Sequence, residues 1–256
     1  MHPAIRLQHI AGACAVLLGL STAHASVVTT SPLDAGLSGT ATLSFNPDLL
    51  GALDTGRVSV APNQPIIQPQ VIRDTDGFYS SVSVTAPITS VTYDPSSREI
   101  FGVGTSGGLV MTAPALKSVS SGGSLTVTDL RADLSAQTIY ATVIGANGVG
   151  TLNNMALWNF NGLSSGTSPL SATITGLSIT VQGFDAFTKS LGLLSLGKAA
   201  LAGVTDFGTI TSTIYPLLSA PPGPDWHITS VPEPTTYALM GLGLAGLAVA
   251  RRRRLA

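Results

Sequence analysis

The chain has 256 residues, one cysteine, a formal net charge of −1 and 10% charged residues. Seven basic and twelve acidic side chains lie in residues 26–231, which gives this body a net charge of −5. A mildly acidic body of about 205 residues without cysteine is large enough for one domain, excludes disulfides and thiolate chemistry, and argues against nucleic-acid binding.

The N-terminus has the layout of a secretory signal peptide. Arg6 supplies the positive charge, residues 10–20 are mostly apolar, and Ala23 and Ala25 form the small-x-small pattern of a cleavage site. Residues 1–25 are therefore predicted to be removed during export.

The single cysteine, Cys14, lies inside the apolar stretch and offers a lipoprotein alternative. Lipidation would require a leucine-like residue three positions earlier, where Ala11 stands. The apolar run also continues past the cysteine to Leu20. This layout favours cleavage after Ala25 over attachment of a lipid.

Residues 26–215 are predicted to form a β-rich extracytoplasmic domain. Apolar and polar residues alternate in several short runs, as is typical of half-buried strands. The clearest runs are 40–45, 81–84, 139–143 and 171–175. Asp-Gly, Asn-Gly and Asp-Pro turn signals separate the runs. The predicted fold class is all-β, an antiparallel sandwich- or barrel-like single domain with one short helix.

Two places break the alternation. The apolar residues of 125–127 stand at odd positions and those of 130–134 at even positions, so one regular strand cannot place both sets on the same face. A β-bulge or bend near Thr128 and Asp129 is therefore predicted. A second bend is predicted at Gly176.

The remaining segments of the body differ in composition. Helical spacing of apolar residues predicts a helix over 184–194, and a shorter helical turn is predicted at 49–53. Four prolines fall in nine residues from Pro216 onward. Residues 216–230 are predicted to be an extended Pro-rich spacer that holds the domain off the membrane.

One loop matches two catalytic or cofactor patterns. Residues 102–107 have the form G-x-G-x-x-G, and residues 104–108 have the form G-x-S-x-G. A dinucleotide site and a nucleophile elbow both need a helix after the loop. Residues 109–111 followed by Pro114 predict a strand instead, so a glycine-rich turn is expected and no cofactor is predicted.

Metal and histidine chemistry have little support in the body. His227 is the only histidine outside the predicted signal peptide, whereas a serine triad or an imidazole zinc site needs more partners. Residues 73–77 resemble part of a calcium loop but lack its acidic register and bidentate glutamate. A turn is the preferred interpretation.

Two further groups are candidates for other functions. Asp129, Arg131 and Asp133 alternate and would share one solvent face of a strand. A glycosidase that uses two carboxylates remains an open alternative. Trp158 and Phe160 could line a sugar-binding face, although core packing is the preferred interpretation.

The last 26 residues, 231–256, have three parts. Pro232, Glu233 and Pro234 come first, the apolar segment 237–250 comes next, and the chain continues with Arg251, Arg252, Arg253 and Arg254. As a helix the apolar segment would be about 21 Å long, which is short beside a hydrocarbon core of about 30 Å, although flanking arginines extend its reach. The arginines are predicted to stay cytoplasmic and determine topology.

In this order, the three parts resemble the PEP-CTERM sorting signal of exported proteins in Gram-negative bacteria. The resemblance covers only the last tenth of the chain. It implies recognition by an exosortase, a transpeptidase-like membrane enzyme, and cleavage near Pro232–Pro234. It also implies association with exopolysaccharide and biofilm. A permanent C-terminal anchor is the alternative.

These features predict a non-catalytic protein of the cell envelope or extracellular matrix. Its expected partners are the secretion machinery, an exosortase-like enzyme, the membrane and exopolysaccharide, with no nucleic acid and no metal. A polysaccharide-binding module and, after it, a carboxylate-dependent glycosidase are the alternatives.

Overall fold

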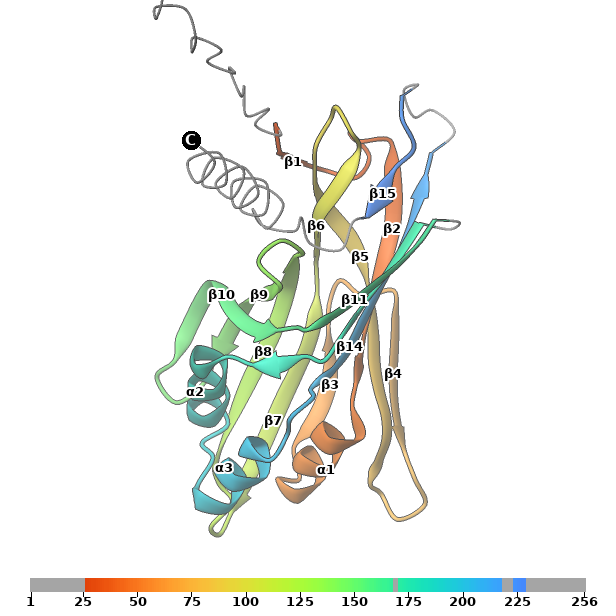
Figure 1. The fold of residues 1–256 in the computed structure, drawn as a ribbon. Coiled ribbons are helices and arrows are strands. Elements are labelled where there is room, and N and C mark those ends of the chain that lie inside the picture. Colours follow the sequence, from red (N-terminus) through yellow and green to blue (C-terminus); the bar gives the residue numbers. More distant parts are fainter. Residues whose placement is uncertain (1–25, 168–169, 218–222, 229–256) are drawn as a thin grey trace, which may run out of the picture.

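The fold was analysed in a computed structural model, which describes residues 26–167, 170–217 and 223–228 (Figure 1). Fifteen strands within these ranges form one sheet. The strands are β1 (Val28–Thr30), β2 (Leu37–Phe45), β3 (Ser59–Asn63), β4 (Gln68–Arg73), β5 (Tyr79–Tyr93), β6 (Glu99–Thr105), β7 (Gly108–Leu116), β8 (Ser120–Asp133), β9 (Thr138–Gly145), β10 (Gly150–Asn159), β11 (Gly162–Thr167), β12 (Leu170–Thr175), β13 (Ser178–Ile179), β14 (Gly208–Pro216) and β15 (His227–Ile228). Three helices accompany them, α1 (Pro47–Thr55), α2 (Val181–Ser190) and α3 (Ser195–Ala202).

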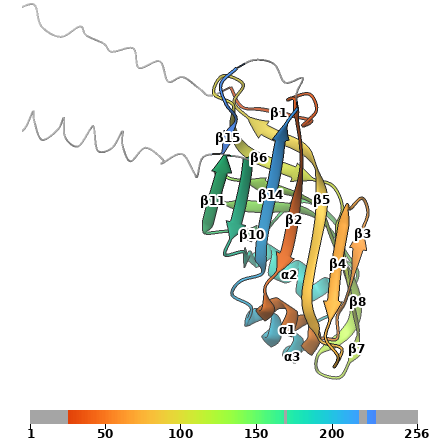
Figure 2. The same ribbon diagram turned by 90° about the vertical axis from the view of Figure 1, so that its right-hand side faces the viewer.

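The sheet is curled into a half-barrel. Its main path runs β11-β12-β14-β2-β5-β6-β8-β9-β10-β13, and β1, β3, β4, β7 and β15 branch from it. The pairings are antiparallel except for β15, which lies parallel to β6. The three helices gather at one end of the sheet, while β1 and β15 lie at the other (Figures 1 and 2). The predicted all-β, antiparallel class is confirmed.

The curl arises where long strands change partners. The first part of β5 pairs with β2 and β4, and its last part, from Ile88 to Tyr93, pairs with β6 and β1. Likewise, β8 pairs with β7 as far as Thr128 and with β6 from Arg131 onward. A strand that belongs to two differently oriented parts of a sheet has to bend between them.

The predicted break in β8 is a β-bulge. Between Thr128 and Arg131 the register against β9 shifts, and Asp129 adopts a φ of 52°. As a result, Val127 on one side of the bulge and Ala132 on the other are both buried, although their positions differ in parity. The extra residue keeps the apolar side chains on the inner face.

The bend at Gly176 is also confirmed. Gly176 has a φ of 68° and separates β12 from β13. The chain thereby passes from β12, which pairs with β14, to β13, which pairs with β10 through Ile179 and Trp158. Val181 then begins α2 and is 88% exposed, so it does not continue the inner apolar face.

The core lies between the inner face of the sheet and the helices. Alternating residues of the four clearest predicted runs are buried, as expected. Phe207, just before β14, is 1% exposed and connects distant parts of the core. Its ring lies 6.2 Å from Trp158 on β10 and 6.3 Å from Phe187 on α2.

The helix content differs from the prediction of one short helix, because the described residues contain three. The predicted helix over 184–194 corresponds to α2, which begins at the Thr180 cap and stops before Gly192. The turn predicted at 49–53 is a full helix, α1. The third helix, α3, has no side-chain cap, and its Gly197 lies against the backbone of Val119. The helix α3 therefore forms because it packs on the sheet, and local sequence signals do not predict it.

The position of Phe207 predicts a large loss of stability on truncation. We expect Phe207→Ala to lower the free energy of unfolding by about 3–5 kcal/mol, because it removes the shared contact of α2 and β10. Phe78→Ala makes the same chemical change at a side chain that is 55% exposed, and it should cost less than about 0.5–1 kcal/mol. Urea unfolding of the two variants measures the difference, and equal losses would show that Phe207 does not hold the core together.

Candidate functional site

The last described part of the chain, residues 223–228, lies against the body and is here called the docked segment. It ends in β15, where His227 and Ile228 pair with Glu99 and Ile100 of β6. Ile228 is 6% exposed and belongs to the core cluster. The docked segment is therefore part of the folded body.

An aromatic and cationic cluster holds the docked segment at the β5–β6 hairpin. The ring of Trp226 meets that of Tyr93 edge-on at 4.9 Å. The Arg98 guanidinium lies 5.4 Å from the Trp226 ring, and its Nη1 donates to the carbonyl oxygen of Pro224 at 3.0 Å. At partly exposed positions each ring contact is worth about 0.5–1 kcal/mol. Several weak contacts thus hold the segment in place.

This geometry differs from the extended Pro-rich spacer predicted over residues 216–230. Strand β14 continues to Pro216, and the amide of Leu217 donates to the carbonyl oxygen of Gly36 at 2.8 Å. Residues 223–228 are then bound to β6. The predicted spacer is thus anchored to the body on both sides of residues 218–222, because its apolar residues, Trp226 and Ile228, find partners on the sheet.

Comparison with protein families identifies the tail beyond the docked segment. A family model described as the PEP-CTERM protein-sorting motif matches residues 230–254. The chain carries a PEP-CTERM sorting tail. This tail belongs to exported proteins that are sorted to the cell surface and processed by an exosortase. No curated protein and no solved structure matched the chain.

The residues of the predicted sorting and targeting sites lie outside the described ranges. They are Ala23 and Ala25 of the predicted signal cleavage site, and Pro232, Glu233, Pro234, Arg251, Arg252, Arg253 and Arg254 of the PEP-CTERM tail. The apolar segment 237–250 also lies outside them. Among the helices that the structure describes, none has the length and apolar character needed to span a bilayer.

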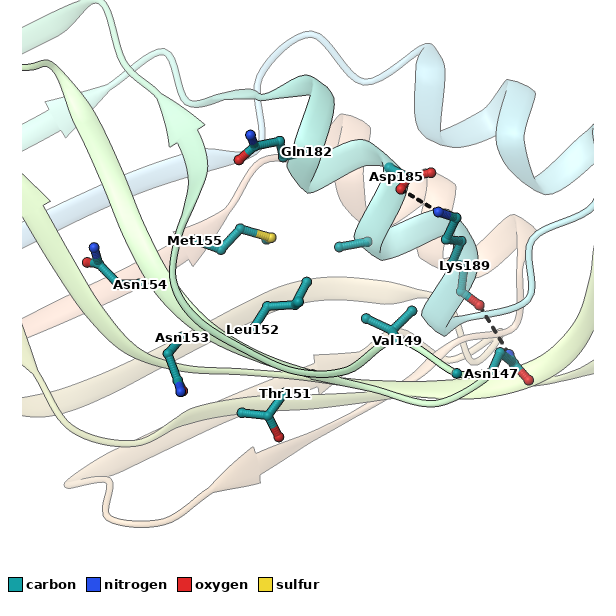
Figure 3. Close-up of a pocket in the computed structure, with 12 residues that line it drawn as sticks. Asn147, Val149, Thr151, Leu152, Asn153, Asn154, Met155, Gln182, Asp185 and Lys189 are labelled. Carbon is teal, nitrogen blue, oxygen red and sulfur yellow. Dashed lines mark hydrogen bonds and ion pairs between the residues drawn. The ribbon is translucent and has the colours of Figure 1, made fainter.

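A groove of about 900 Å³ lies between β10 and α2 (Figure 3). Val149, Leu152 and Met155 point toward α2 and form an apolar floor, whereas Thr151 and Asn153 point to the other side of the strand (Figure 3). The strand β13 pairs with β10 only at Trp158 and Asn159, so the earlier part of β10 borders the groove instead of β13.

The rim of the groove carries its charges on α2. Lys189 Nζ lies 2.7 Å from Asp185 Oδ2, and both side chains are more than half exposed. Asn147 donates to the carbonyl oxygens of Lys189 and Ser190 and so fixes the loop before β10 to the end of α2. Among the described residues that line the groove, Asp185 is the only one with a carboxylate. A two-carboxylate glycosidase needs a second acid about 5–9 Å away, and this lining does not supply it.

Trp158 and Phe160 do not line a sugar-binding face. Trp158 is 2% exposed and Phe160 is 4% exposed. Both residues belong to the core cluster beneath the sheet. The preferred interpretation, core packing, is confirmed.

The glycine-rich stretch joins two strands. Gly102 and Gly104 belong to β6, and β7 begins at Gly108, so a strand comes after the loop as predicted. Gly107 has a φ of 85°, and a Cβ atom there would overlap the carbonyl oxygen of Pro65. The loop also meets the bulge of β8, because the Gly107 amide donates to Asp129 Oδ1 at 3.3 Å and its carbonyl accepts from the Asp129 amide at 3.1 Å.

The three charged residues of β8 do not act as one group. Asp129 turns to Gly107 at the bulge. Arg131 Nη1 lies 3.6 Å from Asp133 Oδ2, and the Arg131 guanidinium lies 4.4 Å from the centre of the Tyr140 ring. The bulge therefore separates Asp129 from the shared face that strict alternation predicts.

The acidic turn between β4 and β5 uses its carboxylate for the backbone. Asp74 Oδ1 accepts from the amides of Asp76 at 3.0 Å and Phe78 at 2.8 Å. This bonding is the expected Asx turn. In the described ranges, no three His, Cys, Asp or Glu side chains gather closely enough to hold a metal ion. His227 lies in β15, with Nδ1 3.3 Å from the carbonyl oxygen of Asp225.

The sequence interpretation missed the Trp226 cluster. Its available signal was a tryptophan in a proline-rich segment, since a large apolar ring is rarely left without a partner. Arg98 gave no such signal, because its φ of 59° and its contact with Trp226 appear only in the fold. The two residues are 128 positions apart in the chain.

The close approach of Gly107 to Pro65 predicts that alanine destabilises the protein more at Gly107 than at Gly148. Gly107→Ala should lower the free energy of unfolding by at least about 2 kcal/mol, because the positive φ and the overlap with Pro65 both oppose a side chain. Gly148 has a φ of 82°, and a Cβ atom there would meet nothing within 4 Å, so Gly148→Ala should cost only about 1 kcal/mol. Chemical denaturation measures the free energy of unfolding of both variants. Equal losses would mean that the loop at Gly107 shifts to make room for the added methyl group.

Proposed function

We propose that this protein is a non-catalytic component of the cell envelope or extracellular matrix, associated with exopolysaccharide or biofilm. In this proposal residues 1–25 direct export through the secretion machinery. The PEP-CTERM tail then holds the chain in the membrane by its segment 237–250 until an exosortase-like enzyme cuts it. The observation that carries the proposal is the sorting motif at residues 230–254 directly after a folded body.

The use of carboxylates within the body supports a structural role. The Asp54 carboxylate accepts from the amide of Tyr79, and Asp206 accepts from the amides of Leu177 and Gly208. Asp74 and Asp129 bind backbone amides in the same way. Carboxylates with these partners stabilise turns and bends, and a protein whose acids are used in this manner needs no catalytic activity to explain them.

The absence of cysteine from residues 26–231 fits the same role. A protein outside the cytoplasm often depends on disulfides for stability. Here the long β-ladders and one continuous core serve instead. Such a body keeps its structure whatever the redox state of its surroundings.

Replacement of the sorting motif tests the proposal. We expect cells that express the parent protein, tagged beside Gly77 at the tip of the β4–β5 hairpin, to yield a mature form that begins at Ser26 and lacks Arg251–Arg254. Alanine at Pro232, Glu233 and Pro234 should keep the arginines and leave the protein in the membrane fraction. Alanine at Pro221 and Pro222 is the matched control and should leave processing unchanged. Mass spectrometry of both termini reads the result, and a mature parent protein that retains the arginines would contradict it.

A polysaccharide-binding function is a second candidate, and the groove between β10 and α2 is the observation in its favour. Its volume of about 900 Å³ lies within the range of ligand sites. An apolar floor at Leu152 with hydrogen-bonding groups at Gln182 and Lys189 suits a sugar with one apolar face and several hydroxyls.

The groove can be tested without disturbing the core. If a glycan array detects a ligand, Leu152→Glu should weaken its binding at least tenfold, because a charge replaces the apolar floor. Ile144→Glu makes a similar change at a residue that is 45% exposed on β9 and not part of the groove lining, and it should bind like the parent protein. Absence of glycan binding by the parent protein would remove this candidate.

A further inference from the structure

The docked segment brings the sorting motif close to the folded body. Ile228 is buried against the sheet, and Pro232 comes only four residues later. A fully extended chain covers at most about 3.3–3.6 Å per residue, so Pro232 lies within about 14 Å of Ile228. Tyr237, where the apolar segment begins, lies within about 32 Å of Ile228 by the same measure.

Release of the docked segment would change this distance greatly. The next fixed point upstream is Leu217, whose amide donates to Gly36. Pro232 stands fifteen positions after Leu217, and this stretch of chain can extend over about 50 Å. Undocking therefore increases the reach of the sorting motif from about 14 Å to about 50 Å without unfolding β14.

This difference matters for an enzyme in the membrane. The enzyme has to surround the segment Pro232–Pro234 while the apolar tail holds the same chain in the bilayer. With the segment docked, β15 lies along β6 beside the β5–β6 hairpin, and β1 pairs with the end of β5 in the same part of the body (Figures 1 and 2). With the segment released, the body can move away from the bilayer and leave the motif accessible.

We infer that residues 223–228 control access of the sorting enzyme to the PEP-CTERM motif. Trp226, together with Arg98 and Tyr93, is then a positioning residue of the sorting reaction. The inference rests on the proposed processing of the tail and adds the step before it, in which β15 separates from β6.

The structure of the docked segment suits a reversible step. Its strand has two residues, its β-pairing within the described chain is with β6, and Ile228 is its one buried side chain. The hydrogen bond that the His227 amide donates to the carbonyl oxygen of Arg98 is long, at 3.3 Å. Trp226 is half-buried, and Gly223, Pro224 and Asp225 are exposed. Short segments with few buried contacts open locally while the rest of a domain stays folded.

Two opposite changes test the inference in cells that process the parent protein. Trp226→Ala removes both ring contacts of the docked segment and should speed conversion of precursor to mature protein at least threefold. His227→Cys with Glu99→Cys places two thiols on paired residues of neighbouring strands, whose separation of about 4.8 Å permits a disulfide. In the oxidised form, conversion should slow at least tenfold, and added reductant should restore it.

Matched controls separate access from folding. Each single cysteine variant should show no slowing on oxidation, because it cannot form the bond and the body contains no other cysteine. Phe78→Ala, an aromatic truncation far from the docked segment, should also be processed at the parent rate. Thermal unfolding of each purified variant checks that the body keeps its fold.

The outcomes distinguish control by the docked segment from processing itself. Equal conversion rates for the parent, Trp226→Ala and disulfide-bonded proteins, or slower conversion of Trp226→Ala, would overturn control by the docked segment while leaving processing intact. Failure of the parent protein to be converted would overturn processing, and the parent would then behave like the variant with alanine at Pro232, Glu233 and Pro234.

Discussion

The curl of the sheet depends on the hydrogen bonds between Asp129 and Gly107. At this point β8 changes its neighbour from β7 to β6, and the chain between β6 and β7 has to turn at the same place. The amide and carbonyl of Gly107 both bond to Asp129, and Asn63 on β3 donates to Thr128 beside it. Without the extra residue, the apolar side chains on one half of β8 would face solvent.

The curled sheet has a consequence for the C-terminal end. The β5–β6 hairpin lies at the end opposite the helices, and there the docked segment adds to β6 and places Trp226 against Tyr93. The same segment leads directly into the sorting motif. The folded body and the PEP-CTERM tail are thus mechanically connected, and the stability of two residues of β15 bears on how the tail is presented.

The body itself uses its polar groups to build turns. Asp54, Asp74 and Asp206 accept backbone amides, and Asn147 joins the end of α2 to the loop before β10. These contacts show what several of the few charged and polar side chains do: they stabilise the turns that surround the apolar interior. The groove beside β10 is the feature that turn-building does not explain, since its floor at Leu152 is apolar and 36% exposed.

Features that depend on neighbouring residues could be predicted from the sequence alone. Alternation predicted the strands, the change of parity around Asp129 predicted the bulge, and the order of Pro232–Pro234, an apolar segment and arginines predicted the sorting tail. The helix α3, the contact of Trp226 with Tyr93 and the approach of Gly107 to Asp129 became visible only in the folded chain. These outcomes rest on contacts between residues far apart in the chain, whose energies no local pattern records.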